Sequence, residues 1–129
     1  MPDFVGWGNL PRFPFGDSPE IADALLSLIL DGRKTASCWS AAEGVKDTKG
    51  GGRWIVEDGD GRPRALLETT ALYQRRFDLV DKAFAAAEGE GDLSLSYWRE
   101  AHEAYFVRNG EFAPDMPLWC EHFRLIKTI

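Results

Sequence analysis

Gly32-Arg33-Lys34-Thr35-Ala36-Ser37 is the stretch around which the rest of the chain is organised. It follows a segment with the apolar spacing of a helix, and it precedes residues typical of a strand. Its glycine can adopt the left-handed conformation that ends a helix. The stretch therefore marks the change from helix to strand, and it places an amine beside two hydroxyl groups.

The segment before this stretch has the features of a helix. Asp17-Ser18-Pro19-Glu20 offers a capping side chain, a proline in the first turn and an acid favoured by the helix dipole. Apolar residues follow at helical spacing, so we predict a helix over residues 18–30. Residues 1–16 hold four aromatic residues among three glycines and three prolines. They predict an arm without regular structure that packs its rings on the core.

The segments after the stretch alternate short apolar runs with turn residues. Few of them form strand–helix–strand units, which favours a curled, mostly antiparallel sheet or open barrel in an α+β domain. We predict strands over residues 35–39, 53–57, 64–72 and 118–126, a hairpin turn over 58–61, loops over 40–52, 88–92 and 111–117, a helix over 78–87, and another helix capped by Asp92 or Ser94.

Composition places the chain among ordinary globular proteins. Its 129 residues, 44% hydrophobic and 28% charged, predict one domain over residues 1–129. No apolar run approaches the roughly 20 residues that a membrane span needs, and the first residues lack the basic region of a signal peptide. The two cysteines and two histidines show no metal-ligand spacing. We therefore expect a cytoplasmic protein with free thiols and with no metal or other cofactor.

The charge is distributed unevenly. The chain carries a net charge of −6, which argues against passive binding to duplex nucleic acid. Between Arg33 and Arg76, however, nine basic residues stand against six acidic ones. This locally basic middle suits a small anionic or nucleotide-like ligand, and the alternative is an ordinary solvated surface.

Lys34 and Ser37 form the first candidate site. A lysine acts as a general base only if burial or a cationic neighbour lowers its pKa from about 10.4, and Arg33 offers such a neighbour. Ser37 could then attack an acyl carbon while Lys34 takes its proton. An ideal strand would point the two side chains to opposite faces, so the glycine turn must reorient Lys34. The alternative is a solvent-facing lysine whose neighbouring hydroxyls bond the backbone.

Carboxylates and aromatic rings supply further candidates. Glu88 and Glu90, in a glycine-rich segment, could act as a general acid or orient the lysine. They could equally be solvated acids near a helix start. Trp39 and Tyr97 could stack a planar base, although most aromatic residues in a chain of this size belong to the core.

Taken together, several motifs in this order resemble the bacterial ASCH domain family, over nearly the whole chain. They are Phe15-Gly16-Asp17-Ser18-Pro19-Glu20, Gly32-Arg33-Lys34-Thr35-Ala36-Ser37, Glu68-Thr69-Thr70, Glu88-Gly89-Glu90-Gly91-Asp92, Ser94-Leu95 with Tyr97-Trp98-Arg99, and Asp115-Met116-Pro117 with Cys120-Glu121. The resemblance implies a PUA-like β-barrel flanked by helices.

The resemblance also implies two kinds of activity. Some members resemble metal-independent amidohydrolases that remove the acyl group from N4-acetylcytidine and related nucleosides, and others are described as ribonucleases or RNA-binding modules. For the first activity it implies a catalytic set of Lys34, Ser37 and Glu88, with a slip in the alignment making the acid Glu90. The ligand contacts implied beside them are Arg33, Trp39, Glu68, Glu90 and Tyr97.

Trp39 departs from the family pattern, which expects an arginine at that position. The change removes a phosphate or base-edge donor, so it weakens the RNA interpretation more than the nucleoside one. We therefore expect a small modified nucleoside as the ligand, RNA as the alternative partner, and no membrane partner. Whether the protein is a monomer or a homodimer stays open at this stage.

Overall fold

The computed structural model describes residues 10–16, 18–44 and 52–129, and within them the chain forms five strands and three α-helices. In chain order the elements are β1 (Arg12–Pro14), α1 (Pro19–Leu30), β2 (Ala36–Ser40), β3 (Arg53–Glu57), β4 (Pro63–Arg76), α2 (Lys82–Glu88), α3 (Leu95–Arg108) and β5 (Pro117–Thr128), with 3₁₀ turns η3 (Ala41–Glu43) and η4 (Phe77–Leu79). Of the described helices, none combines the length and the apolar character needed to cross a bilayer.

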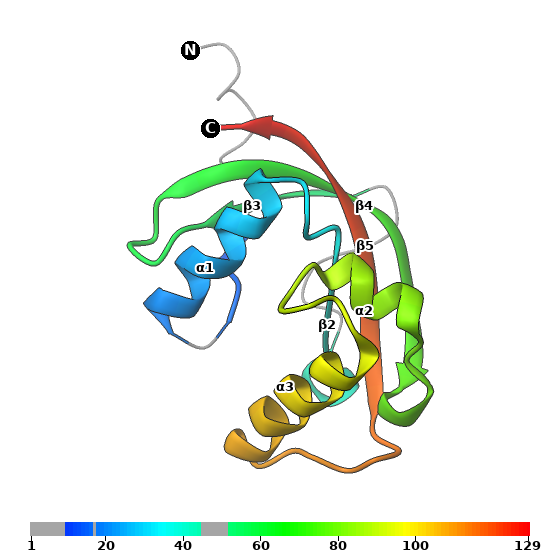
Figure 1. The fold of residues 1–129 in the computed structure, drawn as a ribbon. Helices are drawn as coiled ribbons and strands as arrows, with labels where there is room; N and C mark the ends of the chain where they lie inside the picture. Colours follow the sequence, from blue (N-terminus) through cyan, green and yellow to red (C-terminus); the bar gives the residue numbers. More distant parts are fainter. Residues whose placement is uncertain (1–9, 17, 45–51) are drawn as a thin grey trace.

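The strands form one sheet in the order β1-β3-β4-β5-β2. All neighbours are antiparallel except β1 and β3, which run parallel. The pairing of the two longest strands, β4 and β5, shifts register between Leu66 and Leu67 and again between Thr69 and Ala71. Such irregularities bend a strand pair, and Figure 1 shows β4 and β5 curving around the helices. The predicted α+β fold, a curled and mostly antiparallel sheet with flanking helices, is confirmed.

Two apolar clusters fill the concave side of the sheet. Helix α1 begins at the predicted position because the Ser18 hydroxyl accepts a hydrogen bond from the Ile21 N–H group at 3.2 Å. Its buried Leu26 and Ile29 pack with Trp54 in one cluster. Helices α2 and α3 contribute the second cluster, which contains Phe84, Trp98 and Phe106. The two clusters leave a space between α1 and α3 that becomes the candidate site.

Three predictions about the elements need correction. The N-terminal arm contains strand β1, whose Phe13 lies opposite Val56 and stacks on Trp54 with ring centroids 4.9 Å apart. The helix predicted over 78–87 is divided, because Asp81 caps α2 only after the η4 turn. Strand β4 continues beyond the predicted end at Leu72 to Arg76. Residues 1–9 of the arm and 45–51 of the predicted loop lie outside the described residues.

Candidate active site

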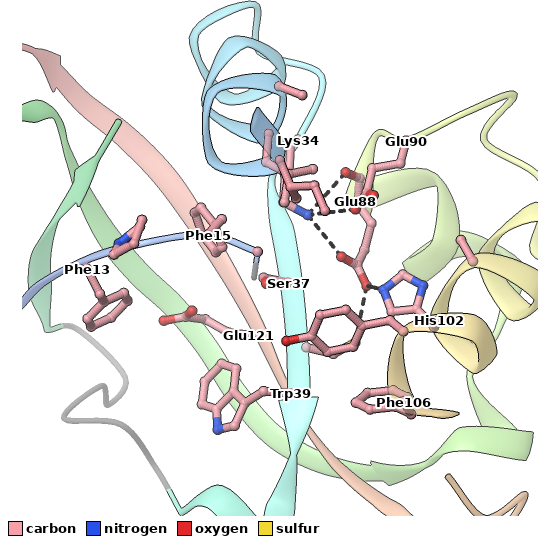
Figure 2. A pocket seen from close by; sticks show the side chains of 18 of the residues that line it. Phe13, Phe15, Lys34, Ser37, Trp39, Glu88, Glu90, His102, Phe106 and Glu121 are labelled. Carbon is pink, nitrogen blue, oxygen red and sulfur yellow. Dashed lines mark hydrogen bonds and ion pairs between the residues drawn. The ribbon is translucent and has the colours of Figure 1, made fainter. Parts of the chain in front are cut away.

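A cavity of about 390 Å³ lies between the two clusters, within the size range of small-molecule sites. Apolar side chains of the β1 segment, α1 and α3 form much of its wall. Figure 2 shows that chemically active side chains from the strands and from the α2–α3 region point into it. Its polar lining includes Lys34, Ser37, Cys38, Glu88, Glu90, His102 and Glu121.

Lys34 reaches this cavity because it precedes the strand instead of belonging to it. Gly32 has φ 78°, in the left-handed region, and the Lys34 N–H group still bonds the Leu28 carbonyl at 3.1 Å. Strand β2 begins only at Ala36. The alternation that would separate Lys34 from Ser37 therefore does not apply, and both side chains line the same cavity.

Buried Lys34 and Glu88 and partly exposed Glu90 form a group that we term the Lys34 ion cluster. The Lys34 Nζ atom lies 2.9 Å from Glu88 Oε1 and 3.2 Å from Glu90 Oε2. The Lys34 and Glu88 side chains are 1% and 2% exposed, so water screens their pairing little. The Phe15 ring lies 5.6 Å from Nζ and covers another side of the ammonium group. Lys34 is thus fixed as a buried cation.

Gly89 makes the approach of Glu88 to Lys34 sterically possible. It has φ 74°, and a side chain there would collide with the backbone of Arg33 and Lys34. In addition, the Thr35 N–H group bonds the Ala87 carbonyl at 2.7 Å, which ties the end of α2 to the segment before β2. The glycine-rich segment therefore brings the two glutamates to the lysine.

The pKa of Lys34 differs from the sequence expectation. Burial alone would lower it, but the charges and hydrogen bonds of Glu88 and Glu90 outweigh burial, so the pKa is raised above its ordinary value. Arg33 is exposed and does not line the cavity. The expectation that a lowered pKa leaves Lys34 neutral and able to accept a proton is therefore wrong, because Lys34 is an ammonium ion.

The second carboxylate oxygen of Glu88 contacts side chains on the other side of the cavity. Glu88 Oε2 accepts hydrogen bonds from Trp98 Nε1 at 2.7 Å and from the Cys38 thiol at 3.3 Å. His102 Nε2 lies 3.2 Å from the same oxygen. Burial would raise the pKa of Glu88, but Lys34 and His102 outweigh it and hold that pKa well below its usual value. Glu88 is therefore a permanently charged acceptor shared by several donors.

The opposite wall of the cavity comes from the sheet. Ser37 on β2 lies directly opposite Glu121 on β5, and both are buried. The Trp39 ring is held in place because its Nε1 donates to the Gly44 carbonyl at 2.6 Å. Within the described residues, no hydrogen bond joins Lys34 to Ser37. The cavity therefore presents a hydroxyl, a cation and an indole around one open volume.

The structure brings together only part of the predicted site. Lys34, Ser37, Glu88, Glu90 and Trp39 line the cavity, whereas the other three predicted contacts do not. Arg33 is exposed, Tyr97 packs its ring against Gly91, and Glu68 pairs with Arg53 and Arg124. Glu68 and Tyr97 are therefore explained by surface ion pairing and by loop packing.

The cavity residues that were not predicted as site residues include Cys38, His102 and Glu121. Trp98 and His102 lie four residues apart on α3, a spacing that is also typical of residues on the core face of a helix. His102 Nδ1 lies 2.9 Å from the Trp98 carbonyl, which can only accept, so Nδ1 carries a proton. Glu121 interrupts the alternating apolar positions Trp119, Phe123 and Leu125, and this is the signal that could have revealed it.

One combination of these side chains could hold a metal ion. The ligand atoms of Cys38, Glu88 and His102 lie within 4.8 Å of one another. The Glu88 oxygen concerned already accepts a hydrogen bond from Trp98 Nε1. The positive charge of Lys34 also lies beside the same carboxylate, and it would repel a cation. The expectation that the protein uses no metal stays a prediction.

We expect His102 to make stability depend on pH. Burial would lower its pKa, but the Glu88 carboxylate raises it above the ordinary value of 6.5. A raised histidine pKa stabilises the fold fully below pH 6.5, and this contribution is lost as pH rises through the folded-state pKa. Urea unfolding of the wild type should therefore show a loss of stability above pH 6.5 that His102→Gln removes.

The comparison with His102→Gln is needed because Glu121 adds a pH dependence of its own. Its pKa is raised to about 7 from 4.5. Its contribution to the free energy of unfolding therefore decreases as the pH rises from 4.5 to about 7, in both proteins. Each unit by which the His102 pKa is raised adds about 1.4 kcal/mol to the difference between wild type and variant. Parallel stability curves for the two proteins above pH 6.5 would contradict the expectation.

Comparison with known proteins agrees with this fold. The family model for the ASCH domain matches residues 12–127. A crystal structure of an ASCH domain from Lactobacillus crispatus JV V101 is 35% identical, with a TM-score of 0.81 over 90% of this chain and 79% of that one. Protein EF3133 from Enterococcus faecalis V583 is 32% identical, with a TM-score of 0.79 over 92% and 77% of the two chains.

A more distant structure shares the fold alone. Hypothetical protein PH0355 is 13% identical, with a TM-score of 0.60 over 89% of this chain and 97% of that one. No curated protein sequence matches the chain. The family match covers nearly all of the described sheet and helices, including every residue of the Lys34 ion cluster. The chain belongs to the ASCH domain family.

Proposed function

We propose that this protein is a metal-independent amidohydrolase that removes the acyl group from N4-acetylcytidine and related N4-acylated cytosine nucleosides. The observation that carries the proposal is a buried ammonium group, Lys34, fixed by two carboxylates in a cavity that also presents the Ser37 hydroxyl. A nucleophile and a fixed positive charge around one volume suit acyl transfer. The resemblance to family members with this activity supplies the substrate class.

In this mechanism Ser37 attacks the amide carbon and forms an acyl-enzyme, which water then clears. The carbonyl oxygen becomes negatively charged during the attack. Lys34 stabilises that charge as an ammonium ion, because its pKa is raised by Glu88 and Glu90. Glu88 holds the lysine in place from one side while Trp98 and His102 anchor Glu88 from the other. Lys34 is thus an electrostatic catalyst in the resting cavity.

The rest of the cavity fits a nucleobase better than a nucleic-acid strand. Trp39 and Phe15 line the volume with aromatic surface on which a planar ring can stack. Several arginines of the basic middle segment are already paired with carboxylates on the surface. This pairing leaves less positive charge for a phosphate backbone and favours the nucleoside over the RNA alternative.

The test is release of cytidine from N4-acetylcytidine in the presence of EDTA, followed by chromatography. We expect the wild type to be active and Ser37→Ala to lose essentially all activity. Thr35→Ala is the matched control, because Thr35 carries the other hydroxyl of the same stretch but is exposed and bonds the Ala87 carbonyl at 3.3 Å. Full activity of Ser37→Ala, or dependence of the wild type on an added metal, would refute the proposal.

A further inference from the structure

Glu121 is a buried carboxyl group in the cavity that the mechanism above leaves unused. It is 1% exposed and lies on β5, directly opposite Ser37 on β2. Residues opposite each other on antiparallel strands point to the same face, with Cβ atoms about 4.5–5.5 Å apart. Both side chains line the cavity, and Figure 2 shows Glu121 on the wall that carries Ser37 and Trp39.

A relay of hydrogen bonds fixes the orientation of the Glu121 carboxyl group. Trp54 Nε1, which can only donate, lies 3.2 Å from Thr69 Oγ1. Thr69 must therefore use its own hydroxyl proton to bond Glu121 Oε2, at 2.6 Å. Oε2 is thereby occupied as an acceptor. Among the described residues Oε1 has no hydrogen-bond partner, so it is the oxygen available to the cavity.

The two buried carboxyl groups, Glu88 and Glu121, have pKa values shifted in opposite directions by their surroundings. Glu88 accepts from several donors and stays charged, as described above. Burial raises the pKa of Glu121 to about 7, and the Thr69 hydrogen bond offsets only part of the effect. Of the strands flanking β5, β2 presents uncharged Ser37 and β4 presents uncharged Thr69 to Glu121. Carboxylates separated in this way commonly divide the roles in catalysis.

We infer that Glu121 is the general base that takes the proton of Ser37, an assignment that rests on the amidohydrolase function proposed above. Lys34 cannot serve because it is a cation held by two carboxylates. Glu88 cannot serve because its oxygens already accept from Lys34, Trp98 and Cys38. Among the described residues Glu121 Oε1 has no hydrogen-bond partner, and Thr69 fixes the carboxyl group through Oε2 on the wall that carries the nucleophile.

The proton transfers balance with this one group. In acylation the Ser37 proton moves to Glu121 Oε1 as Oγ bonds the acyl carbon, and the carbonyl electron pair moves to oxygen beside Lys34. When the C–N4 bond breaks, the proton passes from Glu121 to N4, which leaves as the amino group of cytidine. Water then gives a proton to Glu121 and its oxygen to the acyl carbon. Collapse releases the carboxylic acid, and Ser37 recovers the proton from Glu121.

The first test is the pH dependence of kcat/KM for N4-acetylcytidine. The wild-type value should rise with pH through about 7, because only ionised Glu121 accepts the proton. Glu121→Gln keeps an acceptor for Thr69 but cannot act as a base. It should lower kcat by about 100-fold or more and abolish this rise. A Glu121→Gln variant with wild-type kcat and an unchanged profile would overturn the inference.

The second test uses a matched pair at Thr69, a positioning residue. Thr69→Val removes the hydroxyl that stabilises charged Glu121, so the rise should move to higher pH. Thr69→Ser keeps the hydroxyl and should restore the wild-type profile. The other titratable and charged groups lining the cavity are Lys34, Cys38, Glu88, Glu90, His102, Tyr105 and Arg108. His102→Gln is the control for the histidine near neutral pH, and it should keep the rise near 7.

A third readout separates this inference from the proposed function. A fluorophosphonate reacts with an activated serine whatever the natural substrate, and mass spectrometry locates the adduct. Labelling of Ser37 should follow the same pH profile and be about 100-fold slower in Glu121→Gln. An inactive wild type whose Ser37 is labelled in this way would refute the nucleoside function alone. Equal labelling rates in wild type and Glu121→Gln would refute the role of Glu121.

Discussion

Glu88→Ala is expected to lower the free energy of unfolding by about 3–5 kcal/mol. The substitution removes the closest partner of the Lys34 ammonium group, whose side chain is 1% exposed, and leaves it with the partly exposed Glu90 carboxylate and the backbone carbonyl of residue 88. It also removes the acceptor of the buried Trp98 Nε1 and the carboxylate facing His102. A buried charge that loses its closest counter-ion and a buried donor that loses its acceptor both carry a desolvation penalty.

Urea unfolding, with far-UV circular dichroism as the probe, measures this loss. Glu103→Ala is the control, because Glu103 is exposed on α3 and should change stability by less than about 0.5 kcal/mol. Glu88→Gln keeps the volume, but its amide donor faces another donor on whichever side it takes, so it should also destabilise the fold. A loss below about 1 kcal/mol for Glu88→Ala would show that the Lys34 ion cluster does not support the fold.

Local sequence signals predicted most of the helices and strands of the protein. The helix at 18–30 was predictable because Ser18 bonds its own first turn and the apolar spacing matches the buried face. Strand β3 begins and ends as predicted, since its apolar run is bounded by glycines. Strand β1 was missed because its three residues gain their pairing from β3, more than forty positions later in the chain. Such long-range pairing leaves no local pattern.

The sequence predicted which residues form the site better than it predicted their protonation states. The resemblance placed Lys34, Ser37 and Glu88 in one site, and the structure brings all three to one cavity. The neighbours that set the lysine pKa could not be ranked from sequence, because adjacent Arg33 points to solvent while Glu90 contacts Nζ. Burial raises the pKa of Glu121, and Thr69, fifty-two positions earlier, fixes its carboxyl group through a contact that only the folded sheet creates.

Lys34→Met is expected to reduce kcat for N4-acetylcytidine by about 10³-fold, equivalent to ~4 kcal/mol of transition-state stabilisation. KM should change little, because the charge on the carbonyl oxygen develops mainly after binding. The variant should fold, since Glu88 keeps the donors Trp98 and Cys38 and stays beside His102, while methionine fills the volume of the lysine stem. Steady-state kinetics beside the urea-unfolding midpoint separates lost catalysis from lost structure.

The two halves of the same ion pair should therefore fail in different ways. Removing Glu88 leaves the buried Lys34 ammonium group with Glu90 as its one carboxylate partner in the described part of the chain, so the cost appears in stability. Removing Lys34 leaves a carboxylate that other donors still satisfy, so the cost appears in kcat. Lys34→Arg sharpens the contrast, because a guanidinium group keeps the positive charge but cannot act as a base. Residual kcat of Lys34→Arg well above that of Lys34→Met supports the electrostatic role, whereas Lys34→Met with more than a tenth of wild-type kcat would exclude it.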